Sequence, residues 1–152
     1  MRHPQDGPPR QVLRAAIEVL EDIGLLFRAV SPIIETDPVG PSQRRYANAA
    51  AVVETRRDPP ELLGLLLGTE AVFGRRRRGH QWNARVLDLD IVLWDGGVWT
   101  SRDLAIPHPR FRERGFVLGP AAAVAPDWRD PVSGLSLAQL NARLTRARPL
   151  PR

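Results

Sequence analysis

The chain has 152 residues, of which 43% are hydrophobic and 26% charged, and this composition favours one soluble, folded domain over a disordered segment. No apolar run reaches membrane-spanning length, and the start MRHPQDGPPR lacks the apolar stretch of a signal peptide. The absence of cysteine excludes disulfides and thiolate metal sites and fits a cytoplasmic protein. Without a membrane-spanning run, no membrane partner is expected.

Every basic side chain is arginine, since the chain contains no lysine, and the net charge is +5. Two interpretations are open. A compositional bias would place arginine at scattered surface positions where other proteins use lysine. Anion binding would instead gather guanidinium groups, whose planar fork of donors fits phosphate oxygens. Only the placement of the arginines can decide between these interpretations.

The first half of the chain predicts one helix and two strands. Residues 11–23 carry apolar side chains at three- and four-residue intervals, which predicts an amphipathic helix that ends at Gly24. Residues 25–36 are apolar and β-branched, and they predict a strand that is interrupted near Pro32. Residues 46–55 predict a second strand by their period-two alternation.

The second half predicts two further helices and a strand. Asp58 is a candidate N-cap for a helix over 58–73, and a basic loop, RRRRGHQWNAR, follows this helix. The segment VLDLDIVLW at 86–94 alternates apolar and acidic side chains and predicts a strand. Another helix is predicted from about 113 to 124, and a short one in the remaining tail.

The order helix, strand, strand, helix, strand, helix predicts an α+β fold, namely a ferredoxin-like βαββαβ sandwich with an antiparallel sheet whose opening strand is missing or replaced. We expect an irregular N-terminal segment over 1–10, a single domain over 11–145 and a flexible tail over 146–152.

Asp88 and Asp90 are candidate metal ligands, because two residues apart on a strand their carboxylates would project from the same face. Magnesium is held by one or two carboxylates together with substrate phosphate oxygens and water. A solvated face of the sheet would carry the same pattern. The arginines at 75, 77 and 85 favour the functional interpretation, because they could neutralise a polyphosphate beside the carboxylates.

A second group of side chains suits a flat heterocycle. Tyr46, Trp82 and Phe116 could stack on its faces, and Asn48 could bind its polar edge. Taken one at a time, such residues are more often part of the core than of a binding site. The same holds for His108, which follows one proline and precedes another in a bend where a structural histidine is common.

Four segments resemble the hydroxymethyldihydropterin pyrophosphokinase family in order and approximate spacing. They are ETDPVG at 35–40, YANAA at 46–50, RVLDLDIVL at 85–93, and IPHPRFRERGFVLGP at 106–120 followed by APDW. The last two together form a specific signature. The resemblance covers about residues 11–128.

The resemblance implies transfer of pyrophosphate from ATP to 6-hydroxymethyl-7,8-dihydropterin, giving AMP and the pterin diphosphate in folate biosynthesis. It implies two Mg²⁺ ions held by Asp88 and Asp90. The residues matching catalytic positions are Asp88, Asp90, Arg75, Arg85 and Trp82. Those matching ATP-binding positions are Glu70, Arg77, His108 and Arg114. Those matching the pterin pocket are Thr36, Val39, Tyr46, Asn48 and Phe116.

The chain departs from the family pattern at three places, one of which is a slightly short loop between Gly40 and Tyr46. Around Trp82 it reads QWNAR where the family usually has Arg-Trp-Gly-Pro-Arg. The family opens with an apolar strand, whereas residues 1–10 contain three prolines and cannot form a central strand. A start placed too late, a degenerate homologue, and a sheet that closes the gap or borrows a strand would each explain this. Exposed strand edges would favour a homodimer.

The alternative function class is a non-catalytic binding protein, either a degenerate pterin or nucleotide binder or a basic RNA-binding domain. The RNA interpretation requires aromatic side chains on the sheet, and the predicted strands offer only Tyr46 and Trp94. We therefore expect no specific nucleic-acid partner.

Overall fold

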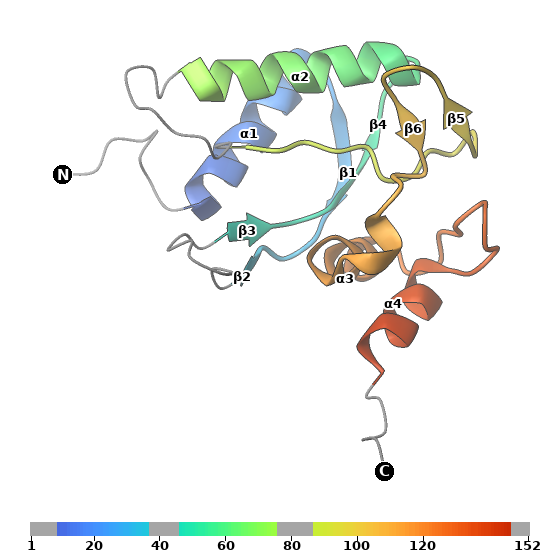
Figure 1. Cartoon of the computed structure of the whole chain (residues 1–152). Helices are drawn as coiled ribbons and strands as arrows, with labels where there is room; N and C mark the ends of the chain where they lie inside the picture. The colour runs from blue at the N-terminus through green and yellow to red at the C-terminus, as the bar shows by residue number, and fades with distance from the viewer. Residues whose placement is uncertain (1–8, 37–45, 76–86, 147–152) are drawn as a thin grey trace.

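The structure is a computed structural model, and it describes residues 9–36, 46–75 and 87–146. Helices and short antiparallel strands alternate through these residues, which confirms the predicted α+β class (Figure 1). Within the described ranges, no helix is long and apolar enough to span a membrane.

The first helix, α1, runs from Pro9 to Ile23 and begins two residues before the predicted start. Its buried face is formed by Val12, Ala16 and Leu20, spaced four residues apart as on one face of a helix. The helix ends at Gly24, whose φ of +116° suits glycine and few other residues. The predicted helix and its stop are confirmed.

Both predicted strands of the first half exist, and each is divided in two. β1 (Leu26–Val30) pairs antiparallel with β4 (Ala51–Glu54), and β2 (Ile34–Thr36) pairs antiparallel with β3 (Tyr46–Asn48). At the break, Ser31 replaces part of the ladder: its amide donates to the Ala50 carbonyl at 2.8 Å, and its Oγ accepts from the Ala50 amide at 2.9 Å. Pro32, which has no N–H to donate, follows directly and accounts for the interruption.

The second long helix, α2, runs from Pro59 to Arg75, and its start is capped as predicted. Oδ1 of Asp58 accepts from the Glu61 amide at 2.9 Å, and Oε1 of Glu61 accepts from the Asp58 amide at 3.0 Å. These reciprocal bonds satisfy two amides that a helix start leaves without partners.

The prediction of a strand over 86–94 is wrong for the residues that the structure describes there. Residues 87–94 cross the molecule as an extended segment, but they join none of the sheets formed by the described residues (Figure 1). The Leu89 amide instead donates to Oε2 of Glu70 in α2 at 2.6 Å, and the Val92 carbonyl accepts from the His108 amide at 3.0 Å. Buried and exposed side chains still alternate along the segment, because packing against the core is enough to cause this pattern. A strand requires in addition a neighbouring backbone with which to form hydrogen bonds.

The last third of the chain is a small hairpin followed by helices. β5 (Trp99–Thr100) pairs with β6 (Ala105–Ile106). The helix predicted from 113 appears in two pieces, the 3₁₀ turn η2 (Phe111–Glu113) and the helix α3 (Gly115–Val124). The predicted tail helix is α4, Leu137–Thr145.

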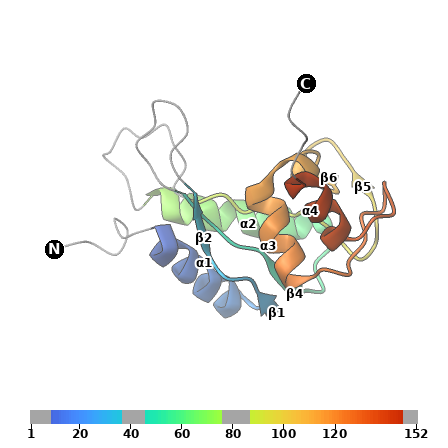
Figure 2. The ribbon, with the colours of Figure 1, turned by 90° about the horizontal axis from the view of Figure 1, so that it is seen from below.

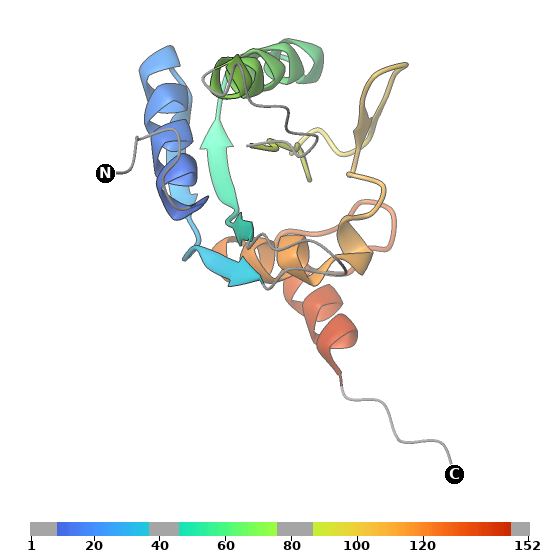
Figure 3. The ribbon, with the colours of Figure 1, turned by 60° about the vertical axis from the view of Figure 1, so that its left-hand side comes forward.

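Two regions of hydrophobic core lie on either side of the extended segment. On one side, Leu87, Leu89 and Ile91 lie among apolar residues of α1 and α2. On the other side, α3, α4 and η2 pack around Phe111 and Leu118. Figure 3 shows these C-terminal helices apart from α1 and α2, and Figure 2 shows them to one side of α1. The two acidic residues that alternate with the leucines therefore point away from the α1–α2 core.

Candidate functional site

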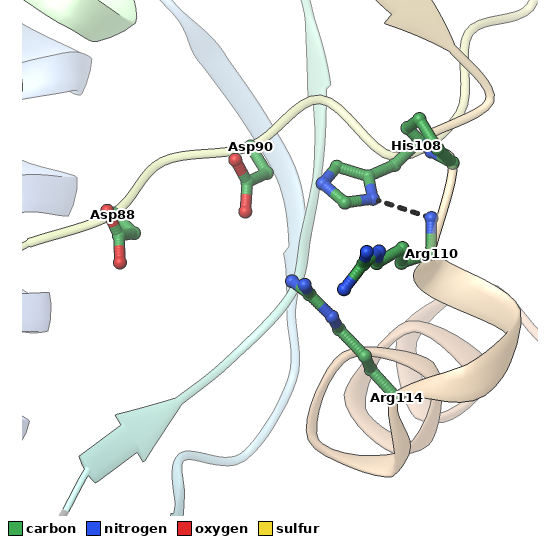
Figure 4. A pocket seen from close by; sticks show the side chains of 6 residues that line it. Asp88, Asp90, His108, Arg110 and Arg114 are labelled. Carbon is green, nitrogen blue, oxygen red and sulfur yellow. Dashed lines mark hydrogen bonds between the residues drawn. The ribbon is translucent and has the colours of Figure 1, made fainter.

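A pocket of about 480 Å³ lies between the extended segment and the start of α3. It is lined by Asp88, Asp90, His108, Pro109, Arg110 and Arg114 (Figure 4). Residues up to 26 positions apart in sequence thus meet at one surface. Figure 4 shows the two carboxylates on one side of the pocket and the imidazole and both guanidinium groups opposite them.

Asp88 and Asp90 are exposed, while Leu87 is buried and Leu89 half-buried. The alternation directs the leucines to the α1–α2 core and both carboxylates into the pocket. Both side chains lie on one face of the segment, as expected, although none of the sheets formed by the described residues includes it.

His108 is held by two hydrogen bonds, one through its backbone and one through its ring. Its amide donates to the Val92 carbonyl at 3.0 Å, which joins it to the extended segment. Its Nδ1 accepts from the Arg110 amide at 3.2 Å. Because Nδ1 is the acceptor, a neutral ring carries its proton on Nε2, and that N–H is available to an anion in the pocket.

Arg110 directly precedes η2 and Arg114 directly follows it, and both side chains extend into the pocket (Figure 4). The carbonyl of Arg114 accepts from the amides of Val117 and Leu118 at 3.0 and 2.8 Å, which fixes its backbone at the start of α3. Its guanidinium carbon lies 5.8 Å from the centre of the Phe116 ring. The side chain is thus directed by both the helix start and the aromatic ring.

The arrangement places acceptor oxygens opposite cationic donors. Among the described residues, no group of three or more His, Cys, Asp or Glu side chains could hold a metal ion by itself. A pair of carboxylates suits a hard cation such as Mg²⁺, which takes its remaining ligands from phosphate oxygens and water. Guanidinium groups across the same pocket suit those phosphate oxygens.

The other residues predicted for catalysis and ATP binding are placed differently. Glu70 does not line the pocket; its carboxylate binds the Leu89 amide from α2, behind the two aspartates. Arg75 is the last residue of α2, where the structure describes the backbone but not the side chain. The predictions for Arg77, Trp82 and Arg85 lie outside the described residues, as does that for Val39.

The remaining residues predicted for a pterin pocket lie on the β2–β3 ribbon and in α3. Thr36 pairs with Tyr46, and Asn48 pairs with Ile34 in the same ribbon. Tyr46 and Phe116 are 44% and 43% exposed, which is high for aromatic residues. The helix α3, which carries Phe116, contacts both β2 and β3, and Phe116 lies beside Arg114 of the pocket.

Sequence reasoning missed Arg110, which lines the pocket two residues after His108 and could have been found by its proximity to it. It also missed the ion pair in which Arg112 Nε and Nη2 donate to Asp130 Oδ2 and Oδ1 at 2.6 and 2.7 Å. No pattern connects these two residues, because 18 positions and a helix separate them.

A family model and several individual proteins similar to this chain all point to one enzyme family. The family model for 7,8-dihydro-6-hydroxymethylpterin-pyrophosphokinase matches residues 5–126. The chain is 38% identical over 135 residues to the 2-amino-4-hydroxy-6-hydroxymethyldihydropteridine pyrophosphokinase of Synechocystis sp., covering 88% of this chain and 69% of that protein. It is likewise 38% identical over 125 residues to the protein of that name from Pseudomonas aeruginosa, covering 81% and 76% of the two chains. A folate synthesis bifunctional protein of Arabidopsis thaliana is 38% identical over 108 residues, 70% of this chain and 22% of that protein.

Proposed function

The chain belongs to the 7,8-dihydro-6-hydroxymethylpterin-pyrophosphokinase family, and we propose that it transfers pyrophosphate from ATP to 6-hydroxymethyl-7,8-dihydropterin, giving AMP and the pterin diphosphate in folate biosynthesis. ATP is the co-substrate. The observation that carries the proposal is the pocket in which Asp88 and Asp90 face His108, Arg110 and Arg114. Carboxylates for a divalent cation and donors for a polyphosphate are both present there.

Asp88 and Asp90 would hold the magnesium of this reaction, two ions according to the family resemblance. Their fit rests on chemistry: both are exposed carboxylates, and they lie opposite the groups that would bind the phosphates. Bound magnesium would supply charge neutralisation along the phosphates. The carboxylates would fix the position of that charge relative to the substrate hydroxyl, so that attack on the β-phosphorus is in line.

His108, Arg110 and Arg114 would bind phosphate oxygens from the opposite side. His108 would donate from Nε2, since Nδ1 is engaged by the Arg110 amide, and the guanidinium groups would donate in pairs. For Arg75, Arg77, Arg85 and Trp82, roles in catalysis and ATP binding rest on the family resemblance. Glu70, also proposed for ATP binding, would act through the segment that carries the two aspartates.

Thr36, Val39, Tyr46, Asn48 and Phe116 would form the pterin site. The exposure of Tyr46 and Phe116 supports this role, because a stacked ring would cover apolar surface that is otherwise open to water. Asn48 would supply a donor and an acceptor to the polar edge of the heterocycle.

A ferredoxin-like sandwich is the proposed fold plan. The extended backbone at residues 87–94, which lies between the α1–α2 core and the C-terminal helices, supports it, because that plan has a strand between the helices at this point of the chain. A strand edge left open in this plan would favour pairing with a second copy of the chain. We place the protein in the cytoplasm, which the absence of cysteine supports.

The test is formation of AMP from Mg-ATP and 6-hydroxymethyl-7,8-dihydropterin by the chain and by Asp90→Asn. The substitution keeps the shape of the side chain and removes its charge, so we expect turnover to fall on the order of 10³-fold, as when an electrostatic group is removed from an active site. Asp95→Asn makes the same change at an exposed turn outside the pocket and should leave turnover unchanged.

Three results would contradict the proposal. Equal turnover by Asp90→Asn and the parent chain would remove the metal assignment. A parent chain that binds ATP and the pterin without forming AMP would be a binding protein derived from the enzyme. Binding of RNA that resists added salt, without pterin binding, would point to the nucleic-acid alternative.

A further inference from the structure

Asp130 is fully buried, and each of its oxygens accepts hydrogen bonds. Arg112 donates to both oxygens, Ser133 Oγ donates to Oδ2 at 2.7 Å, and the Val132 amide donates to Oδ1 at 3.0 Å. The hydrogen bonds from Arg112 hold the pKa of Asp130 well below its ordinary value, although burial acts in the opposite direction. A buried carboxylate satisfied in this way keeps its partner guanidinium in one place.

The backbone around Asp130 is itself held in place. The Asp130 amide donates to the Leu135 carbonyl at 2.9 Å, and its carbonyl accepts from the Gly134 amide at 2.8 Å. The Leu137 amide donates to the Trp128 carbonyl at 2.8 Å, and Leu137 is a core residue at the start of α4. The carboxylate therefore belongs to a turn that is fixed to the C-terminal core.

Arg112 is the middle residue of η2, and the residues two positions before and after it line the pocket. Its guanidinium carbon lies 4.7 Å from the centre of the ring of Phe111, which is fully buried. The side chain is thus held by the carboxylate and by the ring, on a turn whose neighbours Arg110 and Arg114 extend into the pocket (Figure 4).

We propose that Arg112 and Asp130 are positioning residues, and that their ion pair fixes η2 so that Arg110 and Arg114 present their guanidinium groups to a bound triphosphate. The proposal rests on the proposed function for the identity of the ligand. Neither residue contacts the pocket, so the pair acts through η2 and not through the ligand.

The first experiment measures the dissociation constant of Mg-ATP by titration calorimetry for the chain and for Asp130→Asn. The substitution keeps the shape of the side chain and removes its charge, which weakens both bonds to Arg112. We expect the dissociation constant to rise roughly tenfold, as for one weakened charge-assisted contact. The affinity for the pterin should be unchanged. Arg112→Lys keeps the positive charge but cannot form the bidentate pair, so its dissociation constant for Mg-ATP should lie between those of the parent chain and Asp130→Asn.

The second experiment measures amide hydrogen exchange and needs no activity. In Asp130→Asn, the amides of Glu113 and Arg114, which close η2 with bonds to Arg110 and Phe111, should exchange faster, while those of α1 and α2 should not change. If Asp130→Asn does not fold, Arg112→Lys serves for both measurements.

The control is Arg28→Gln, which removes the ion pair of Arg28 with Glu54, an exposed pair on β1 and β4 outside the pocket. It should leave Mg-ATP affinity and η2 exchange unchanged. Lower thermal stability of Asp130→Asn with unchanged Mg-ATP affinity would overturn the positioning role and leave a structural one. A parent chain that does not bind Mg-ATP would overturn the proposed function and the positioning role together, and the exchange experiment would still decide whether the pair fixes η2.

Discussion

Asn48 is the residue in the proposed pterin site whose role can be tested most directly. It is the last residue of β3, and its backbone is held by pairing with Ile34, so removing its amide should not disturb the ribbon. We expect Asn48→Ala to weaken pterin binding on the order of tenfold or more, since a site that binds a polar edge loses heavily when one partner is removed. Affinity for Mg-ATP should change little, and calorimetric titration of each ligand separately measures both effects.

The matched control is Asn141→Ala in α4, which removes the same group from a helix outside the pocket. It should alter neither affinity. If Asn48→Ala weakens pterin and Mg-ATP binding equally, the residue supports the site as a whole and does not recognise the heterocycle.

The site residues differ in how far the sequence could reveal them. Asp88 and Asp90 were predictable as a pair, because period-two alternation directs both carboxylates to one face whether or not the segment joins a sheet. Asp130 was not, since its function depends on burial against Arg112, and burial of a charged residue leaves no local signal in a sequence.

Among the elements, helices were predicted better than strands, for a physical reason. The start of α2 follows from Asp58 and Glu61, which lie three residues apart and satisfy each other's amides. The strand expected at 86–94 depends on a neighbouring backbone that the alternation of its own side chains does not encode. The division of the ribbon depends likewise on residues 31 and 32. Pro32 interrupts the ladder because it has no N–H, and the Ser31 hydroxyl accepts the hydrogen bond of the Ala50 amide at this point.

The extended segment at 87–94 depends on Glu70 for one of its amides, and this contact gives a prediction. Glu70→Ala removes the carboxylate that accepts from the Leu89 amide, between the two aspartates. We expect a loss of about 1–3 kcal/mol in the free energy of unfolding, the range for a polar group deprived of its partner, measured by urea denaturation. Mg-ATP affinity should fall as well, because Asp88 and Asp90 adjoin that amide.

Glu70→Gln is the informative comparison, because its side-chain oxygen can still accept from the Leu89 amide. It should lie close to the parent chain in stability and in Mg-ATP affinity. If Glu70→Gln is as damaging as Glu70→Ala, the charge of Glu70 matters more than its contact with Leu89.

For the molecule as a whole, the extended segment joins two core regions and carries the proposed metal-binding residues between them. Leu87 and Leu89 bury it against α1 and α2, while Val92 and Leu93 pack against the region around Phe111. The proposed phosphate-binding residues belong to the second region. The pocket therefore forms only when both regions are in place, so that global stability and ligand affinity are linked.

Global stability should in turn depend on pH through Asp130. Because the pKa of this carboxyl is lowered in the folded chain, its contribution is fully present above the unfolded value of about 3.9 and is lost as the pH falls below it. Urea unfolding of the parent chain and of Asp130→Asn should therefore show the parent more stable at neutral pH, with the difference shrinking between about pH 4 and pH 2. The other carboxylates are common to both proteins, so the difference isolates Asp130 and its partner Arg112. If the free energies of unfolding of the two proteins changed in parallel with pH over this range, the ion pair would stabilise the folded chain no more than a neutral amide does.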